Sequence, residues 1–244
     1  MKASPDEQKE LLRLQAVDTR LQQLAHTMTS LPQHAALAEL APSVDAVRQR
    51  HTAKSGELED ARTELSRAES DVAVVEARMA RDAARLQQTS SVKDIQALEA
   101  EVDALKKRRG DLEDIELAVM ERIEALESEL AAITEERDEL AMRVTALEAA
   151  KGTEQGVLEA QRAAASADRA AIAATVSDDL IALYERQRAR YGTGAALLVR
   201  GVSMGSNVRL TESDLQTIRV AAPDDVVLCP DSGAILIRNE ESGL

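Results

Sequence analysis

Two short patterns near the C-terminus hold the residue types that could do chemistry. Ser203 and Ser206 lie three residues apart in a glycine-containing turn, and Cys229 and Ser232 have the same spacing in a second turn. Each pair precedes a stretch that reads as a short strand. Two such turns are the layout of a zinc ribbon, in which four thiolates hold one Zn²⁺ in tetrahedral geometry. The spacing is therefore that of a metal-binding motif, but a chain with one cysteine lacks the thiols that such a site needs.

The other reactive groups do not assemble into a catalytic site. Cys229 could act as a nucleophile or redox thiol, but His26, His34 and His51 all lie far from it in the sequence. We therefore interpret Cys229 as a small packed residue. No glycine-rich phosphate loop, metal-ligand cluster or Ser/His/Asp arrangement is present. We expect no catalytic residue and no enzyme activity.

Clusters of basic residues are candidates for contact with an anionic partner or nucleic acid. The alternative is that they form solvated helix faces. Only Tyr184 and Tyr191 could stack on bases, which weakens the nucleic-acid interpretation. The candidates lie in two regions: Arg186, Arg188, Arg190, Arg200 and Arg209, and, separately, Lys106, Lys107 and Arg108.

Composition limits the structures that could position these residues. Aromatic residues make up 1% of the 244 residues and charged residues 30%, which is typical of coiled coils and not of a large globular core. The net charge of −14 means that any nucleic-acid binding has to be local. No apolar run suits a signal peptide or membrane span, so we expect a cytoplasmic protein without membrane contact.

Two unbroken heptad seams organise the chain. One runs from Ile95 to Leu158 and the other from Val44 to Leu86, and the turn between them falls near residues 88–93. So short a turn makes the two helices antiparallel neighbours, with Leu58 near Ile123. A first helix, from Pro5 to about Leu31, is expected to pack on the open end of this hairpin as the third helix of that section.

The pattern changes in the last third of the chain. Gly152 and Gly156 predict a bend or break between residues 150 and 160. A new helix is expected from Ser177 to about Tyr191. Short strands are then predicted at 195–199, 207–210, 218–220, 226–228 and 234–237. The predicted fold is mainly α: a long antiparallel coiled-coil hairpin with an N-terminal helix and a small C-terminal β module like a zinc ribbon. The predicted domains are residues 1–176 and 177–244.

At this point the sequence resembles the bacterial coiled-coil proteins with a C-terminal C4-type zinc ribbon. The resemblance covers nearly the whole chain and is carried by Gln96–Glu101, Asp111–Asp114 and Asp179–Arg186, followed by the two turns. It implies that the ligand positions fall on Ser203, Ser206, Cys229 and Ser232. Because one thiolate and three hydroxyls cannot hold a structural zinc, we expect a degenerate site without metal and no other cofactor. The resemblance also implies a role in regulatory complexes, in handling transcription components, and in RNA binding.

The sequence predicts a non-enzymatic adaptor that binds a protein partner it does not identify. The alternative is a nucleic-acid-binding accessory protein that uses the arginines around the degenerate ribbon. A homodimer is a further alternative, because the first helix and the region after Lys151 have no assigned partner within the chain.

Overall fold

The computed structural model describes every residue from 1 to 244, and these residues form two compact units. The first unit contains Met1–Pro32 and Ala150–Leu244, and the second contains Gln33–Ala149. The boundary that we predicted between residues 176 and 177 lies inside the first unit.

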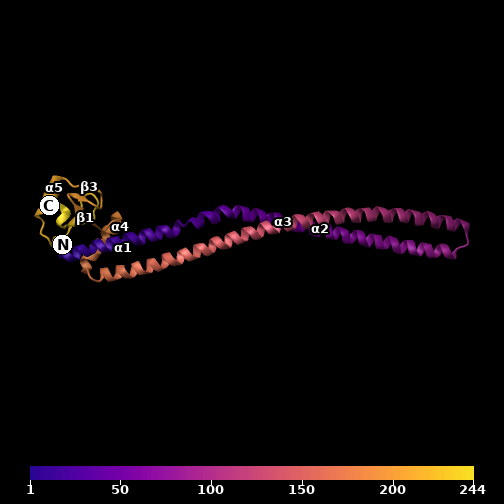
Figure 1. Ribbon diagram of the computed structural model, residues 1–244, viewed down its shortest axis with the longest axis horizontal. Coiled ribbons are helices and arrows are strands. Elements are labelled where there is room, and N and C mark those ends of the chain that lie inside the picture. Colours follow the sequence, from indigo (N-terminus) through magenta and orange to yellow (C-terminus); the bar gives the residue numbers. More distant parts are fainter. The chain divides into compact units, whose positions relative to one another are not determined.

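The chain is mainly helical, as the heptad patterns predicted (Figure 1). None of its helices has a stretch both long and apolar enough to cross a bilayer. In chain order the elements are α1 (Pro5–Thr29), α2 (Pro32–Gln88), α3 (Val92–Ala173), α4 (Asp178–Tyr191), β1 (Ala195–Val199), β2 (Val202–Ser203), β3 (Val208–Arg209), α5 (Glu212–Val220), β4 (Val227–Leu228), β5 (Ile235–Ile237) and a 3₁₀ turn (Glu240–Ser242).

The second unit is the predicted hairpin of α2 and α3. Ion pairs between the two helices advance along α2 while they retreat along α3, so the helices are antiparallel. Their side chains are about half exposed, and such pairs add little stability but specify the register. They join Arg50 to Glu136 (2.6 Å), Lys54 to Glu129 (2.9 Å), Arg62 to Glu127 (2.7 Å), Arg122 to Glu64, and Arg78 to Glu101.

Between the two helices lies the narrow apolar seam. Leu58 and Ala61 of α2 form a buried cluster with Leu126 of α3, and Ile123 packs against it. Leu58 of α2 therefore packs against the part of α3 that the heptad register predicted. The buried residues of the seam are Leu, Val and Ala together with one charged residue, Asp82, and none is aromatic, because a two-helix contact has no room for a thick core.

In the first unit, α1 packs against the last part of α3. Leu24 and Leu31 form a buried cluster with Leu158. Of the bend or break expected between residues 150 and 160, the break does not occur, because α3 is one continuous helix to Ala173. Leu158, Ala165 and Ile172, seven residues apart, are all buried. Continued burial of this seam outweighs the cost of about 1 kcal/mol for each exposed glycine.

A three-helix section does form, but its members differ from those expected. Leu11 and Leu14 of α1 pack with Ile172 of α3 and with Leu180 and Tyr184 of α4. The section therefore combines α1, α3 and α4, whereas the sequence predicted that α1 packs on both α2 and α3. The reason is that α4 carries a second apolar face, which the short turn after Ala173 brings back onto α1.

The C-terminal module is a small five-stranded sheet in the order β3-β2-β1-β5-β4. Its central pair, β1 and β5, is parallel, and the other pairs are antiparallel. The strand expected at 218–220 was wrong, because these residues end helix α5. The Thr211 hydroxyl caps this helix by accepting from the Asp214 N–H, and Leu215 and Ile218 are buried one turn apart. This cap and spacing outweigh the local β preference of Ile218 and Val220.

Candidate functional site

The first of the two C-terminal turns is closed by its serines. The Gly205 N–H donates to Ser203 Oγ (3.3 Å), and the Val208 N–H donates to Ser206 Oγ (3.3 Å). The Asn207 N–H donates to the Ser203 carbonyl (2.8 Å), and Asn207 has a φ of 57°. Each hydroxyl therefore accepts a backbone amide within its own turn.

The second turn repeats this arrangement. The Ser232 N–H lies 3.5 Å from Cys229 Sγ, and the Ala234 N–H donates to Ser232 Oγ (3.4 Å). The Gly233 N–H donates to the Cys229 carbonyl (3.0 Å), and Gly233 has a φ of 66°. In both turns the side chain of the first residue accepts from a backbone N–H, and the side chain of the fourth residue accepts from the N–H two residues later. The fifth residue of each turn has a left-handed backbone conformation.

The two turns meet around the cysteine. Cys229 and Ser203 are both buried, and a β-carbon placed on Gly205 would lie 3.0 Å from Ser232 Oγ. Burial alone would raise the pKa of the Cys229 thiol, but hydrogen bonds from Ser203 and Ser232 outweigh it and place the pKa below its ordinary 9.0. The structure thus brings Ser203, Cys229 and Ser232 together, whereas Ser206 faces the amide of Val208 at the rim.

The side chains of Ser203, Ser206, Cys229 and Ser232 are not a suitable ligand set for a structural zinc ion. A tetrahedral site needs four thiolate, imidazole or carboxylate ligands, and this cluster offers one thiol and neutral hydroxyls. No group of three His, Cys, Asp or Glu residues that could hold a metal comes together in the chain.

The Arg238 side chain anchors another part of the module, and no pattern in the sequence pointed to it. Its guanidinium donates to the carbonyls of Ala221 (2.9 Å), Ala222 (2.6 Å) and Asp225 (2.8 Å). The N-terminus reaches the same loop, because the Ala3 N–H donates to the Asp224 carbonyl (2.8 Å). These contacts fix the segment between α5 and β4.

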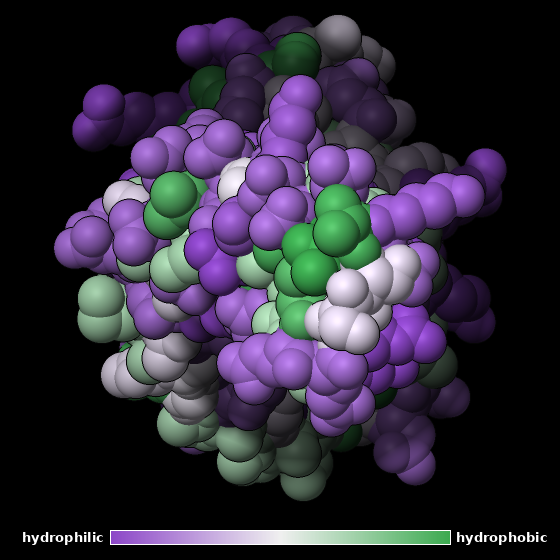
Figure 2. All heavy atoms as spheres, turned by 90° about the vertical axis from the view of Figure 1, so that its right-hand side faces the viewer, coloured by the Kyte–Doolittle hydropathy of each residue, from purple (hydrophilic) through white to green (hydrophobic).

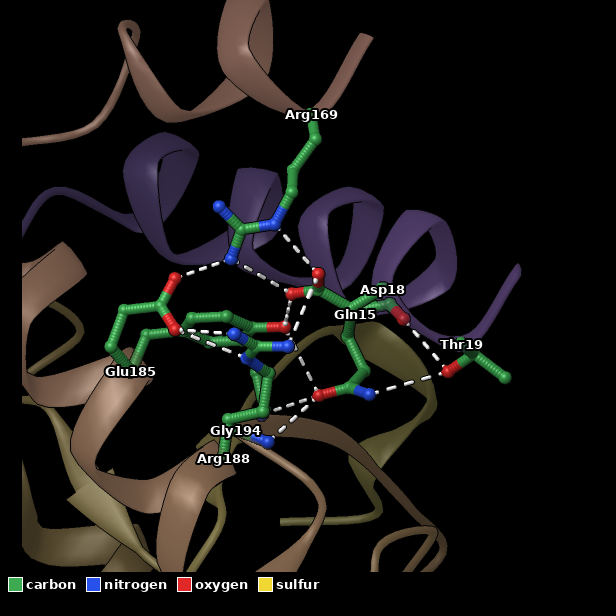
Figure 3. A network of polar contacts seen from close by, with 9 residues as sticks. Gln15, Asp18, Thr19, Arg169, Glu185, Arg188 and Gly194 are labelled. Carbon is green, nitrogen blue, oxygen red and sulfur yellow. Dashed lines mark hydrogen bonds and ion pairs between the residues drawn. The ribbon is translucent and has the colours of Figure 1, made fainter. Parts of the chain in front are cut away.

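The largest polar network lies where the module meets the helices (Figure 3). At its centre the Asp18 carboxylate, 2% exposed, accepts from Arg169 at 2.6 and 3.2 Å and from the Tyr184 hydroxyl at 2.8 Å. Arg188 lies 3.5 Å from the same carboxylate. Glu185 bridges the two arginines by pairing with both. Helices α1, α3 and α4 therefore share one buried charge cluster.

Gln15 extends this network to the sheet. Its Oε1 accepts from the Gly194 N–H (2.7 Å) and the Tyr184 hydroxyl (3.2 Å). Burial first, and then the neighbouring Asp18 carboxylate, raise the pKa of Tyr184 far above its usual range, so its hydroxyl stays a donor. No substrate-sized cleft opens onto the network, and its groups satisfy one another. We interpret the network as structural. The one feature of the sequence that could have revealed it is Asp18, which lies on the apolar face of α1, seven residues after Leu11.

The predicted basic contacts are divided between the two units. Lys106, Lys107 and Arg108 belong to the hairpin, and the five arginines belong to the first unit. Arg188 is engaged in the Asp18 network, while Arg186, Arg190, Arg200 and Arg209 are exposed. Tyr184 is fully buried and cannot stack on a base. Tyr191 is 47% exposed, and the Arg190 guanidinium lies 5.1 Å from its ring centroid.

Three comparisons relate the chain to known proteins. The family model described as "CT398-like coiled coil hairpin domain" matches residues 14–192. The uncharacterised protein MT2288 of Mycobacterium tuberculosis is 35% identical over 243 residues, covering 98% of each chain. A solved structure from Mycobacterium smegmatis is 33% identical, with a TM-score of 0.87 over 98% of this chain and 100% of that one. The structure of CT398 from Chlamydia trachomatis is 18% identical, with a TM-score of 0.67 over 95% of this chain and 97% of that one, and it shows the fold alone.

Replacing the central carboxylate should destabilise the first unit. Asp18→Asn leaves Arg169 and Arg188 without their buried counter-charge, so we expect a loss of about 3 kcal/mol in the free energy of unfolding. Urea unfolding followed by tyrosine fluorescence measures it, because both tyrosines lie in this unit. The control is Glu10→Gln, which breaks the exposed pair with Arg13 and should change little. Equal effects of the two substitutions would contradict the role of the network.

The same network predicts a pH dependence. Burial would raise the pKa of Glu185, but hydrogen bonds from Arg169 and Arg188 outweigh it and place the pKa below its ordinary 4.5. The ion pairs of Glu185 therefore contribute fully to the free energy of unfolding above pH 4.5, and this contribution is lost as the pH falls through the lowered pKa. We expect Glu185→Gln to be less stable than the wild type near neutral pH, with the difference shrinking in acid. A difference that is constant across this range would be inconsistent with the ion pairs.

Proposed function

Because the chain belongs to the CT398-like coiled coil hairpin family, we propose that it is a non-enzymatic cytoplasmic adaptor that binds protein partners in a regulatory complex. One observation carries the proposal. The hairpin closes its own seam within the chain, yet it leaves large apolar side chains in solvent, among them Val74, Leu117 and Met142. These residues are not needed to close the seam. Met142 borders a shallow groove of the hairpin together with Leu130 and Ala131, and an apolar groove on a helical surface suits a protein contact.

Self-association is a weaker reading of the same surface. The dimer hypothesis rested on α1 and on the region after Lys151 lacking partners within the chain. Leu24 and Leu31 of α1 pack against Leu158 of α3, so these two segments cover each other. We therefore favour a partner of different sequence.

The second candidate function is nucleic-acid binding by the first unit. It is favoured by exposed Tyr191 with Arg190 stacked on it, because arginine and aromatic rings together suit single-stranded bases. It is disfavoured by the burial of Tyr184 and by the use of Arg188 inside the protein.

We also propose that the C-terminal module keeps its zinc-ribbon-like turns without metal. In each turn a hydroxyl or thiol accepts the amides that shape it, and Arg238 anchors the loop after α5. Hydrogen bonds made by neutral side chains thus take over the structural role that thiolates and a metal play in a zinc ribbon.

Affinity purification of the full chain from its native cells tests the adaptor proposal. We expect a protein partner that remains bound after nuclease treatment. A partner lost on nuclease treatment, and lost equally in Arg186→Gln/Arg190→Gln, would support the nucleic-acid function instead. Arg188 is left unchanged in this variant because its substitution would also disturb Asp18.

Metal analysis and chelation test the metal-free module. Elemental analysis of the native chain should find no stoichiometric zinc, and EDTA should leave its melting temperature unchanged. Arg238→Met should lower the melting temperature clearly, because several partly buried carbonyls lose their donor. One zinc per chain, or a melting temperature that falls with EDTA, would refute the proposal.

A further inference from the structure

The end of the hairpin differs in charge from the rest of the chain. Residues 78–109, which surround the turn between α2 and α3, contain eight basic and five acidic residues, a net charge of +3. The rest of the chain carries a net charge of −17, and the two parts together give the total of −14. A positive segment in so acidic a protein can attract an acidic partner.

Some of these cations are engaged within the hairpin. Arg78 and Arg85 flank the buried Asp82 at 3.9 and 3.8 Å, and Arg78 also pairs with Glu101. Lys106 pairs with Asp103. These contacts neutralise buried or neighbouring carboxylates, so they are accounted for by the fold itself.

Four other cations have no such role. Arg81, Lys93, Lys107 and Arg108 are exposed and make no ion pair or side-chain hydrogen bond. Two carboxylates of the segment, Asp94 and Glu99, are likewise without an ion-pair partner, so the free charges still favour the positive sign. The fold therefore leaves these four cations available to a partner.

One of the four free cations, Arg81, borders a shallow recess between the two helices. Arg81 lines it from α2 together with Arg78 and Arg85, and Glu101 lines it from α3. An adjoining recess continues along Ala97 and Leu98 towards the turn. Arg108 follows Glu101 by seven residues, so it lies on the same face of α3, two helical turns further from the hairpin turn.

An apolar patch lies at the tip of the hairpin, next to this surface. Val92, the first residue of α3, is 71% exposed. Figure 2 views this end of the hairpin and shows apolar side chains beside weakly polar ones, with hydrophilic side chains around them. An apolar centre within a charged rim is the usual anatomy of a protein contact site.

We propose that this end of the hairpin docks an acidic, amphipathic helix of a partner protein. The helix would place apolar side chains on Leu98 and carboxylates against Arg81 and Arg108, as helix-in-groove complexes do, and its end would reach Val92 at the tip of the hairpin. A nucleic acid suits the site poorly, because Asp94 and Glu101 line the recesses and the hairpin has no aromatic residue to stack on a base. This inference rests on the proposed adaptor function and adds where the partner binds and what its chemistry is.

A peptide selection tests the proposal. The full-length protein is screened against a phage-displayed library of random peptides, and the enriched sequences are synthesised and measured by fluorescence anisotropy. We expect acidic peptides with apolar residues at helical spacing. Arg81→Glu/Arg108→Glu should weaken their binding by about tenfold or more, because two attractive contacts become repulsive. Val92→Ser should weaken it severalfold.

Matched variants keep the test specific. Arg67→Glu/Arg143→Glu makes the same charge change at two exposed arginines of the hairpin without ion pairs, and Val220→Ser replaces a similarly exposed valine outside the hairpin. Both controls should bind like the wild type, and circular dichroism melts should show that all variants fold. Neutral or basic enriched peptides, or equal losses in test and control variants, would overturn the proposal.

The test also separates this inference from the adaptor function. Peptides or native partners that bind the wild type and the end variants equally would remove this docking site and leave the adaptor. Failure of the wild type to retain any protein would remove both. Binding of a labelled single-stranded RNA that is lost in Arg81→Glu/Arg108→Glu would assign the surface to nucleic acid and overturn the proposal.

Discussion

A heptad seam is too narrow to bury itself, and the structure follows from how this chain covers that seam. One helix, α3, carries the seam from the turn at residue 92 to Ile172. In the second unit α2 covers it, and in the first unit α1 does. Because covering takes only a row of aliphatic residues on each helix, the remaining faces are free to be polar. This explains a folded protein with 1% aromatic residues.

Buried polar groups are concentrated where that simple rule no longer suffices. The small module cannot bury enough apolar surface to hold itself, so it depends on directed contacts. Asp18 and Gln15 tie α1 to α4 and the sheet, and Arg238 fixes the loop before β4. The two serine and cysteine turns fit the same logic, because their side chains accept from four backbone amides, three of them partly buried.

Sequence periodicity predicted the parts of the fold that local pattern decides. The two heptad helices, the turn near residues 88–93, α4 and the strands β1 and β5 follow from seams, caps and turn residues that lie close together in the chain. Continuity of α3 through Gly152 and Gly156 was missed, because it depends on a partner helix more than a hundred residues away. Helix α5 was missed because Ile218 and Val220 were weighed by β preference without the Thr211 cap.

The candidate sites show the same division. The spacing of Ser203, Ser206, Cys229 and Ser232 located the paired turns, whereas the Asp18 cluster joins residues from three helices and has no short motif. The count of arginines before β1 could not tell that Arg188 is engaged internally while Arg186 is exposed. Which charges are free is a property of packing, and the free cations near the hairpin turn became visible only with the ion pairs in place.

The measurement that tests self-pairing most directly is an intrachain cross-link. Arg62 and Glu127, which pair across the hairpin, are replaced by cysteines in a Cys229→Ser background. Equal amounts of unlabelled and isotope-labelled chains are refolded together and treated with a short thiol cross-linker. The structure predicts links between residues 62 and 127 of one chain only. Cross-linked peptides that combine labelled and unlabelled chains would show that the seam is covered by a second molecule, and would contradict the fold on which this account is built.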